Sequence, residues 1–421
     1  MKKATLLFLL LACCSLHTAT ATNFVENSLK KSNKQAKNWA LQISSKGKKP
    51  TTYLSVGLVG KMNRLHGVSL NLGGAVTEDK CNAGIQIGGL FNVSQTFSGI
   101  GLAGIVQVYE TGRGVMLSGL ANVTSTFEYG LQTSIIANIN GDVRGAISAA
   151  ALLNVSETNK NSILLAGLAN VTQGQTGGIM VAGLGNITGE NKGLQIAGLA
   201  NINGGNSGMN VGIINVAAKN TGWQLGALNI SAEGKKGIQT GLLNIATDGE
   251  QSLQIGLLNI SALQRKAYQI GLVNVKPHTQ LEYHFTASNA EFLNAAMRFK
   301  NKHTYTTLGL GTHHWGIDEP FTLTATFRAG GYYQFTPQWE AYADLGIKHV
   351  AHLGTRTAEH PRSLYAFQPR IGILYMPSPR FGFTIAGGYQ WAKSYSKGYT
   401  DHKPTIEAGI VFKPWKKKRV E

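Results

Sequence analysis

Two β-type patterns divide this chain of 421 residues. From about residue 81 to residue 275, short apolar segments with a central glycine recur at intervals of 14 to 16 residues and share the motif G-[LIA]-x-N-[VI]. A near-constant interval of this kind indicates a repeat architecture. The asparagine of the motif is Asn92, Asn122, Asn138, Asn154, Asn170, Asn186, Asn201, Asn215, Asn229, Asn244, Asn259 and Asn274, and Gln107 occupies the equivalent slot between the first two.

A unit of about fifteen residues has no room for a helix and a strand, so it forms either one coil of a β-solenoid or one strand and turn of a large barrel. The fixed asparagine slot favours the solenoid, in which parallel coils place equivalent side chains in ladders. The distance from Gln195 to Asn201 is six residues, but Gln254 to Asn259 is five. In one straight strand, a difference of one residue would move the glutamine side chain to the opposite face from the asparagine. A glycine corner between two short strands accommodates the extra residue. We expect thirteen coils, stacked over roughly 60 Å at ~4.8 Å per coil.

After about residue 279 the pattern changes to clean alternation of apolar and polar residues, and 24 of the 35 aromatic residues follow residue 280. Apolar side chains outside, polar ones inside and aromatics near strand ends are typical of a transmembrane β-barrel. Predicted lipid-facing side chains are Phe381, Phe383, Ile385, Tyr389, Trp391, Phe321 and Phe327. Predicted strands are residues 279–287, 292–300, 304–314, 321–335, 338–350, 363–376, 380–393 and 404–413. A soluble β-sandwich or barrel remains open, because alternation does not say which face meets lipid.

The N-terminus has Lys2 and Lys3, an apolar run and a small-residue cleavage sequence ending at Ala21. These features predict a secretory signal peptide over residues 1–21, although lipidation of Cys13 is an alternative. The mature chain would then keep only Cys81, which we expect to be a buried small apolar residue. The predicted organisation continues with a polar, basic linker (22–50), the repeats (51–275), a C-terminal barrel (276–415) and a basic tail (416–421).

Charge is concentrated at the two ends of the chain. Residues 1–80 carry 12 basic and 3 acidic side chains (+9), residues 81–275 carry 9 and 8 (+1), and residues 276–421 carry 18 and 10 (+8), for a net +18. Basic ends beside an anionic membrane surface account for this distribution, so we predict no nucleic-acid partner.

Motifs for catalysis or metal binding are absent from the sequence. There is no HExxH, and the pairs His313–His314 and His349–His352 would point to opposite faces of a strand. Glu340 and Asp344 share the predicted barrel interior, where we expect a salt-bridge network with Arg328 or Lys348 in a small lumen rather than general acid–base chemistry. We therefore predict no catalytic residue, no metal site and no cofactor.

The chain resembles bacterial surface-repeat proteins that carry tandem GLQIGLxN-like units before a β-rich, outer-membrane-like C-terminal region. The matching segments are residues 193–201, 253–259, 269–274 and 297–305, and the resemblance covers roughly residues 53–415. Gln107, and the segment 146–153 without its glycine, depart from the pattern. The resemblance implies a location in the cell envelope and supplies no catalytic or binding residues.

Together these patterns predict an all-β protein, a repeat β-solenoid followed by an antiparallel outer-membrane-type barrel of about eight strands. We expect a non-enzymatic protein of the bacterial outer membrane with a structural, scaffolding or adhesive role. Its expected partners are outer-membrane lipid and an unidentified envelope protein or polysaccharide, with the repeats periplasmic or surface-exposed. The alternative is a single large barrel that acts as a porin or transporter.

Overall fold

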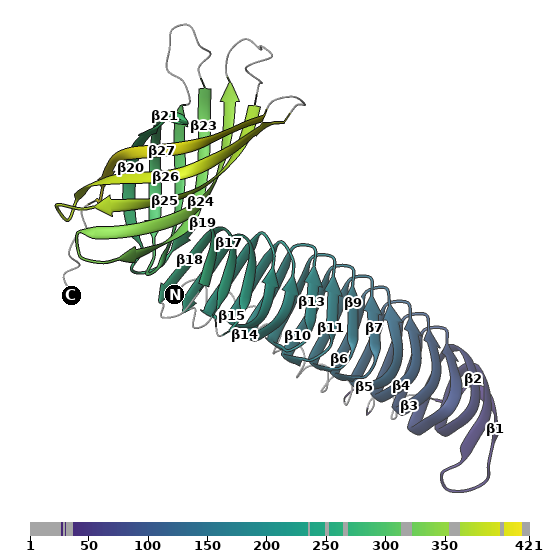
Figure 1. Ribbon diagram of the computed structural model, residues 1–421. Coiled ribbons are helices and arrows are strands. Elements are labelled where there is room, and N and C mark those ends of the chain that lie inside the picture. The colour runs from purple at the N-terminus through teal and green to yellow at the C-terminus, as the bar shows by residue number, and fades with distance from the viewer. Residues whose placement is uncertain are drawn as a thin grey trace. The chain divides into compact units, whose positions relative to one another are not determined.

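The computed structural model describes residues 27, 30, 37–234, 236–248, 252–263, 268–312, 322–352, 363–395 and 400–414 (Figure 1). The chain divides into two compact units, residues 1–253 and 254–421. Among the described residues, no helix has the length and apolar character needed to cross a membrane. The signal-peptide prediction, the Cys13 alternative and the basic tail lie outside the described residues, and so does the side chain of Cys81.

The repeat region forms a β-solenoid (Figure 1). Its strands are β1 (Ala40–Ser44), β2 (Thr51–Gly88), β3 (Phe91–Ala103), β4 (Val106–Ser118), β5 (Ala121–Ser134), β6 (Ala137–Arg144), β7 (Ile147–Ala150), β8 (Leu153–Lys160), β9 (Ile163–Ala166), β10 (Ala169–Thr176), β11 (Ile179–Ala182), β12 (Gly185–Asn191), β13 (Leu194–Ala197), β14 (Ala200–Val211), β15 (Ile214–Leu225), β16 (Leu228–Gly234), β17 (Ile238–Asp248), β18 (Leu253–Leu263) and β19 (Tyr268–Val275).

Equivalent strands of successive coils pair in parallel, which distinguishes a solenoid from an antiparallel barrel. β10 pairs with β8 before it and β12 after it, and Asn170 lies in register with Asn154 and Asn186. The second strand of the same coil, β11, pairs with β9 and β13. Each coil thus places one strand in each of two parallel stacks. The predicted solenoid is confirmed, with about thirteen turns over residues 68–275, and the single large barrel is wrong.

Both departures from the repeat motif keep a regular backbone register. Gln107 lies opposite Asn92 and Asn122, and β7 pairs in parallel with β5 and β9. The N-terminal end differs from the predicted linker, because β1 pairs antiparallel with the start of β2, with Ala40 opposite Gly57. Backbone groups at an open sheet edge need hydrogen-bond partners, and this pairing supplies them to β2.

The C-terminal strands form a closed antiparallel eight-stranded barrel. They are β20 (Gln280–Ser288), β21 (Glu291–Lys300), β22 (Thr304–Thr312), β23 (Thr322–Gln334), β24 (Trp339–His352), β25 (Ser363–Tyr375), β26 (Phe381–Ser394) and β27 (Thr400–Phe412). Closure is made by β20 and β27, with Tyr283 opposite Phe412. All eight predicted strands are present, and the largest difference is at β27, which begins at Thr400 instead of residue 404.

The barrel has two unlike ends. Connections of three to five residues, 301–303, 335–338 and 376–380, lie at the end where the chain enters at β20 and leaves after β27. The opposite end carries the two-residue turn 289–290, the five-residue connection 395–399 and the two longer connections 313–321 and 353–362. Short turns at one end and long loops at the other are typical of outer-membrane barrels.

Candidate functional site

The inward face of the barrel is packed with charged and polar side chains that pair with one another. Asp344 on β24 accepts hydrogen bonds from Tyr305 Oη at 2.7 Å, Arg370 Nε at 2.9 Å and Arg328 Nη1 at 3.2 Å. Arg370 also bonds Glu407 on β27. All five side chains are buried. Strands far apart in sequence are therefore linked through one carboxylate.

A second cluster lies toward the end with the short turns. Lys300 bonds both Glu282, at 3.4 Å, and Glu340. Arg298 has no exposed surface, and its guanidinium carbon lies 4.0 Å from the centre of the Tyr305 ring. Stacking on an aromatic face stabilises a desolvated guanidinium.

These pairs leave little free space inside the barrel. The cavity bounded by His284, Glu291, Arg328, Arg370 and Glu407 has a volume of about 10 Å³. That is about the space of a single water molecule. Around these residues the barrel interior is thus packed.

The acidic residues that the sequence placed in the barrel interior are paired with cations. Glu340 and Asp344 are both engaged with cations, Lys300 and the two arginines. The described residues contain no group of three or more metal-ligating side chains. His349 contacts Tyr395 Oη at 3.2 Å on the outer wall, while His313 and His314 lie outside the described residues.

The outward face of the barrel is apolar and ordered by residue type. Aliphatic side chains, such as Leu345, Ile347 and Ile371, expose more than half of their surface at the middle of their strands. Aromatic side chains flank them at both ends. Rings at the short-turn end include Tyr333, Phe335, Trp339, Tyr375, Phe381, Phe383 and Phe412, and those at the long-loop end include Tyr365, Phe367, Tyr389, Trp391 and Tyr395. An aliphatic band between two aromatic girdles is typical of barrels that cross a bilayer.

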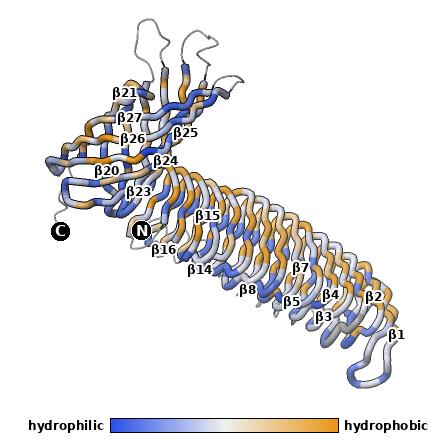
Figure 2. The backbone as a smooth tube through the Cα atoms, in the orientation of Figure 1, coloured by the Kyte–Doolittle hydropathy of each residue, from blue (hydrophilic) through white to orange (hydrophobic). Residues whose placement is uncertain are grey.

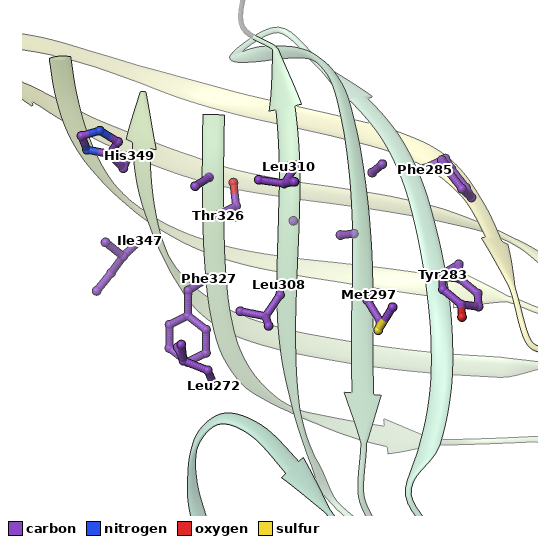
Figure 3. Close-up of a pocket in the computed structure, with 14 residues that line it drawn as sticks. Leu272, Tyr283, Phe285, Met297, Leu308, Leu310, Thr326, Phe327, Ile347 and His349 are labelled. Atoms are coloured by element: carbon purple, nitrogen blue, oxygen red, sulfur yellow. The ribbon is translucent and has the colours of Figure 1, made fainter. Parts of the chain in front are cut away.

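The predicted lipid-facing residues mostly lie on this outer wall. Phe383, Ile385, Tyr389 and Trp391 are exposed, whereas Phe327 and Phe381 are half-buried. Phe321 lies outside the described residues. A hollow of about 640 Å³ opens on the same wall over β20 to β24 (Figure 3), where small residues such as Ala295, Gly309 and Ala325 alternate with larger apolar ones.

The predicted asparagine ladder occupies the solenoid interior. Its twelve asparagines are buried, at 3% exposure or less. Asn170 Nδ2 donates to Asn186 Oδ1 at 2.9 Å and to Val181 O, on the other strand of its coil, at 2.8 Å. The same asparagine-to-asparagine bond joins successive coils from Asn122 to Asn244 and again between Asn259 and Asn274.

Gln107 forms different side-chain hydrogen bonds from those of the ladder asparagines. Its Nε2 donates to Leu117 O at 2.7 Å, and its Oε1 accepts from Tyr109 Oη at 2.8 Å. Its longer side chain thus places the amide oxygen beside Tyr109, whose ring stacks on Phe97 with centres 4.5 Å apart.

Sequence reasoning missed two features. Glu282, Glu291, Arg298, Lys300, Arg370 and Glu407 line the barrel interior, and their inward place in the alternation of each strand could have revealed them. The outer surface of the solenoid was also missed. Figure 2 shows hydrophobic residues along one edge of the stacked coils and hydrophilic residues along the opposite edge.

No protein-family description and no curated protein sequence matches the chain. Solved structures similar to it include small outer-membrane barrels, and the C-terminal region carries this likeness. The N-terminal β-barrel domain of Pseudomonas aeruginosa OprF is 14% identical over 32% of this chain and 96% of that one, with a TM-score of 0.25. Ail, the attachment invasion locus protein of Yersinia pestis, is 15% identical over 32% of this chain and 97% of that one, with a TM-score of 0.22. Neisserial surface protein A is 12% identical over 32% of this chain and 95% of that one, with a TM-score of 0.21.

Proposed function

We propose that this chain is a non-enzymatic protein of the bacterial outer membrane, in which the eight-stranded barrel is the membrane anchor of the repeat solenoid. The observation that carries the proposal is the outer wall, an exposed aliphatic band between two girdles of aromatic rings. In water such a surface would promote aggregation, whereas in a bilayer its apolar side chains meet acyl chains. The predicted signal peptide agrees with export.

The chain direction supports a scaffolding role on the periplasmic side. The solenoid ends at Val275, and the barrel begins at Gln280, at the end that carries the short turns. Short turns of outer-membrane barrels face the periplasm, so the repeats would extend there rather than from the cell surface. Adhesion would require the opposite orientation.

Protease treatment of intact cells, followed by mapping of the released peptides, tests the orientation. We expect peptides from residues 353–362 and protection of residues 81–275 until the outer membrane is permeabilised. Release of repeat peptides from intact cells would support an adhesive role instead. Recovery of the full chain in the soluble fraction would contradict the membrane anchor.

Liposome swelling tests the porin alternative. Because ion pairs fill the lumen, proteoliposomes should swell in sugar solutions no faster than empty liposomes. Sugar-dependent swelling would favour a pore.

A further inference from the structure

The outer surface of the solenoid carries two rows of apolar, mainly aliphatic side chains that are exposed or half-buried. One row is the corner residue two positions before each ladder position from Asn92 to Asn259, and each of its large members exposes between 39% and 58% of its surface. These members are Leu90, Ile105, Leu120, Ile136, Leu152, Leu168, Leu184, Leu199, Ile213, Leu242 and Leu257. Backbone hydrogen bonds join many of the consecutive corners, for example from Leu184 N to Leu168 O at 2.9 Å. The row therefore follows the stacking of the coils.

A second row lies on the adjacent strand stack. Parallel register aligns Ile147, Ile163 and Ile179 on β7, β9 and β11. The alignment continues to Leu194, Met209, Trp223 and Ile238. We call these two rows, with the outward residues between them, the aliphatic face.

Charge is excluded from this face along its whole length. For every slot from Asn92 to Asn259, the residues from seven before the slot to two after it include no Asp, Glu, Lys or Arg. The charged residues of the coils all follow their slot by three to seven positions, as Glu110 follows Gln107 and Lys236 follows Asn229. One edge of the coils is thus charged, while the other is aliphatic.

We propose that the aliphatic face lies on the membrane and buries its side chains at the boundary of the acyl chains of the leaflet from which the solenoid extends. The proposal rests on the proposed barrel anchor, which holds the solenoid at high effective concentration beside the bilayer. A large exposed apolar patch marks a protein or a membrane contact. Protein interfaces are enriched in aromatic residues and arginine, whereas this face is mainly Leu, Ile and Val, which favours lipid.

The N-terminal end of the solenoid fits the same contact. Trp39, Leu41 and Ile43 are exposed on and beside β1, and Lys46 and Lys48 follow them on the surface. Aromatic and aliphatic side chains beside lysines bind the interface of anionic bilayers. The solenoid thus has a second, basic contact for lipid phosphates.

Site-specific fluorescence in proteoliposomes tests the proposal. The full chain, with Cys13, Cys14 and Cys81 replaced by serine, is given a single nitrobenzoxadiazole-labelled cysteine through Leu184→Cys on the aliphatic face or Ala232→Cys on the charged edge. In vesicles of phosphatidylethanolamine and phosphatidylglycerol, we expect the Leu184→Cys emission to shift to the blue and to be quenched by doxyl-labelled lipid. The Ala232→Cys emission should stay solvent-like and unquenched.

A charge-matched pair of variants provides the second measurement. Leu168→Asp with Leu184→Asp and Leu199→Asp adds three carboxylates to the aliphatic face, and Asn161→Asp with Ala232→Asp and Thr247→Asp adds three to exposed positions of the charged edge. With a label at Ile213→Cys, the first set should abolish the quenching and the second should preserve it.

Other outcomes overturn the proposal in distinguishable ways. A blue shift without lipid quenching, which grows with the ratio of protein to lipid, would mean that the face binds a second copy. A solvent-like signal at Leu184→Cys while the barrel is protected from protease would refute lipid contact and leave the anchor intact. Failure of the chain to float with the vesicles would refute the anchor and this inference together.

Discussion

Lys348 Nζ donates a hydrogen bond of 2.7 Å to Glu291 Oε2 inside the barrel, and both side chains are buried. The two residues lie on β24 and β21, which are separated in the barrel by β22 and β23. The pair therefore links strands that share no backbone hydrogen bonds. Together with the cluster around Asp344, it fills the part of the barrel interior beside the buried apolar cluster of Tyr342, Leu374, Met376 and Val411.

Removing one member of this pair should destabilise the barrel more than removing both. Lys348→Met leaves Glu291 buried and without its cation, and breaking a buried ion pair in this way costs about 3–5 kcal/mol. The double variant Lys348→Met with Glu291→Gln should lose clearly less. Urea unfolding of the refolded chain in detergent micelles measures the unfolding free energy of each variant. Equal losses of unfolding free energy in the single and double variants would contradict a coupled pair.

The outer wall should reject charge at mid-strand and tolerate it near a strand end. Ile385 belongs to the exposed outer wall, and Arg near the bilayer midplane costs about 2–4 kcal/mol, falling to about 0–1 near the interfaces. Ile385→Arg should therefore reduce the yield of folding into vesicles, whereas Tyr333→Arg, at an exposed site near the short-turn end, should have little effect. A water-facing wall would tolerate both changes equally.

Loss of a single side-chain amide from the asparagine ladder should destabilise the solenoid. Asn170→Ala removes the donor to Val181 O and to Asn186 and leaves buried acceptors without it, which costs about 1–3 kcal/mol. Because repeat arrays can open locally, hydrogen exchange should increase in β8, β10 and β12. Thr247→Ala, at an exposed position, is the control and should leave exchange unchanged.

A corner glycine should be intolerant of a methyl group. A Cβ added at Gly183 would lie 2.0 Å from Gly167 O, in the backbone of the preceding coil. Overpacking of this kind costs typically about 1–3 kcal/mol. Gly183→Ala should lower the thermal midpoint of the solenoid, while Gly387→Ala, where a Cβ would meet no atom within 4 Å, should not lower that of the barrel.

We expect the contribution of Asp142, on the charged edge of the solenoid, to the stability of the fold to depend on pH. Burial raises its pKa, but hydrogen bonds from Thr158 and Arg144 and the Arg144 charge outweigh burial, so the pKa lies below its ordinary value. A carboxyl whose pKa is lower in the folded chain stabilises the fold above its unfolded pKa and loses that contribution as pH falls through the folded value. The stability difference between wild type and Asp142→Asn should therefore vanish in acid. A difference that is constant with pH would contradict this account.

The sequence by itself determined the strands and the face on which each side chain lies. A period of two residues assigned Phe383 and Ile385 to one face of β26 and Thr384 to the other, because successive side chains of a strand must point to opposite sides. The constant asparagine slot likewise favoured parallel coils, because parallel stacking places equivalent residues together, and the register of Asn154, Asn170 and Asn186 confirms them.

Tertiary structure alone decided which inward charges pair. Lys348 and Glu291 are 57 residues apart, and they meet only because closure of the barrel by β20 and β27 fixes the stagger of all eight strands. The partner of Gln107 was also beyond the sequence, because it depends on where the ring of Tyr109 lies inside the coil. Local periodicity determines the face of a strand on which each side chain lies. Contact between side chains across the lumen depends instead on the closed geometry of the whole sheet.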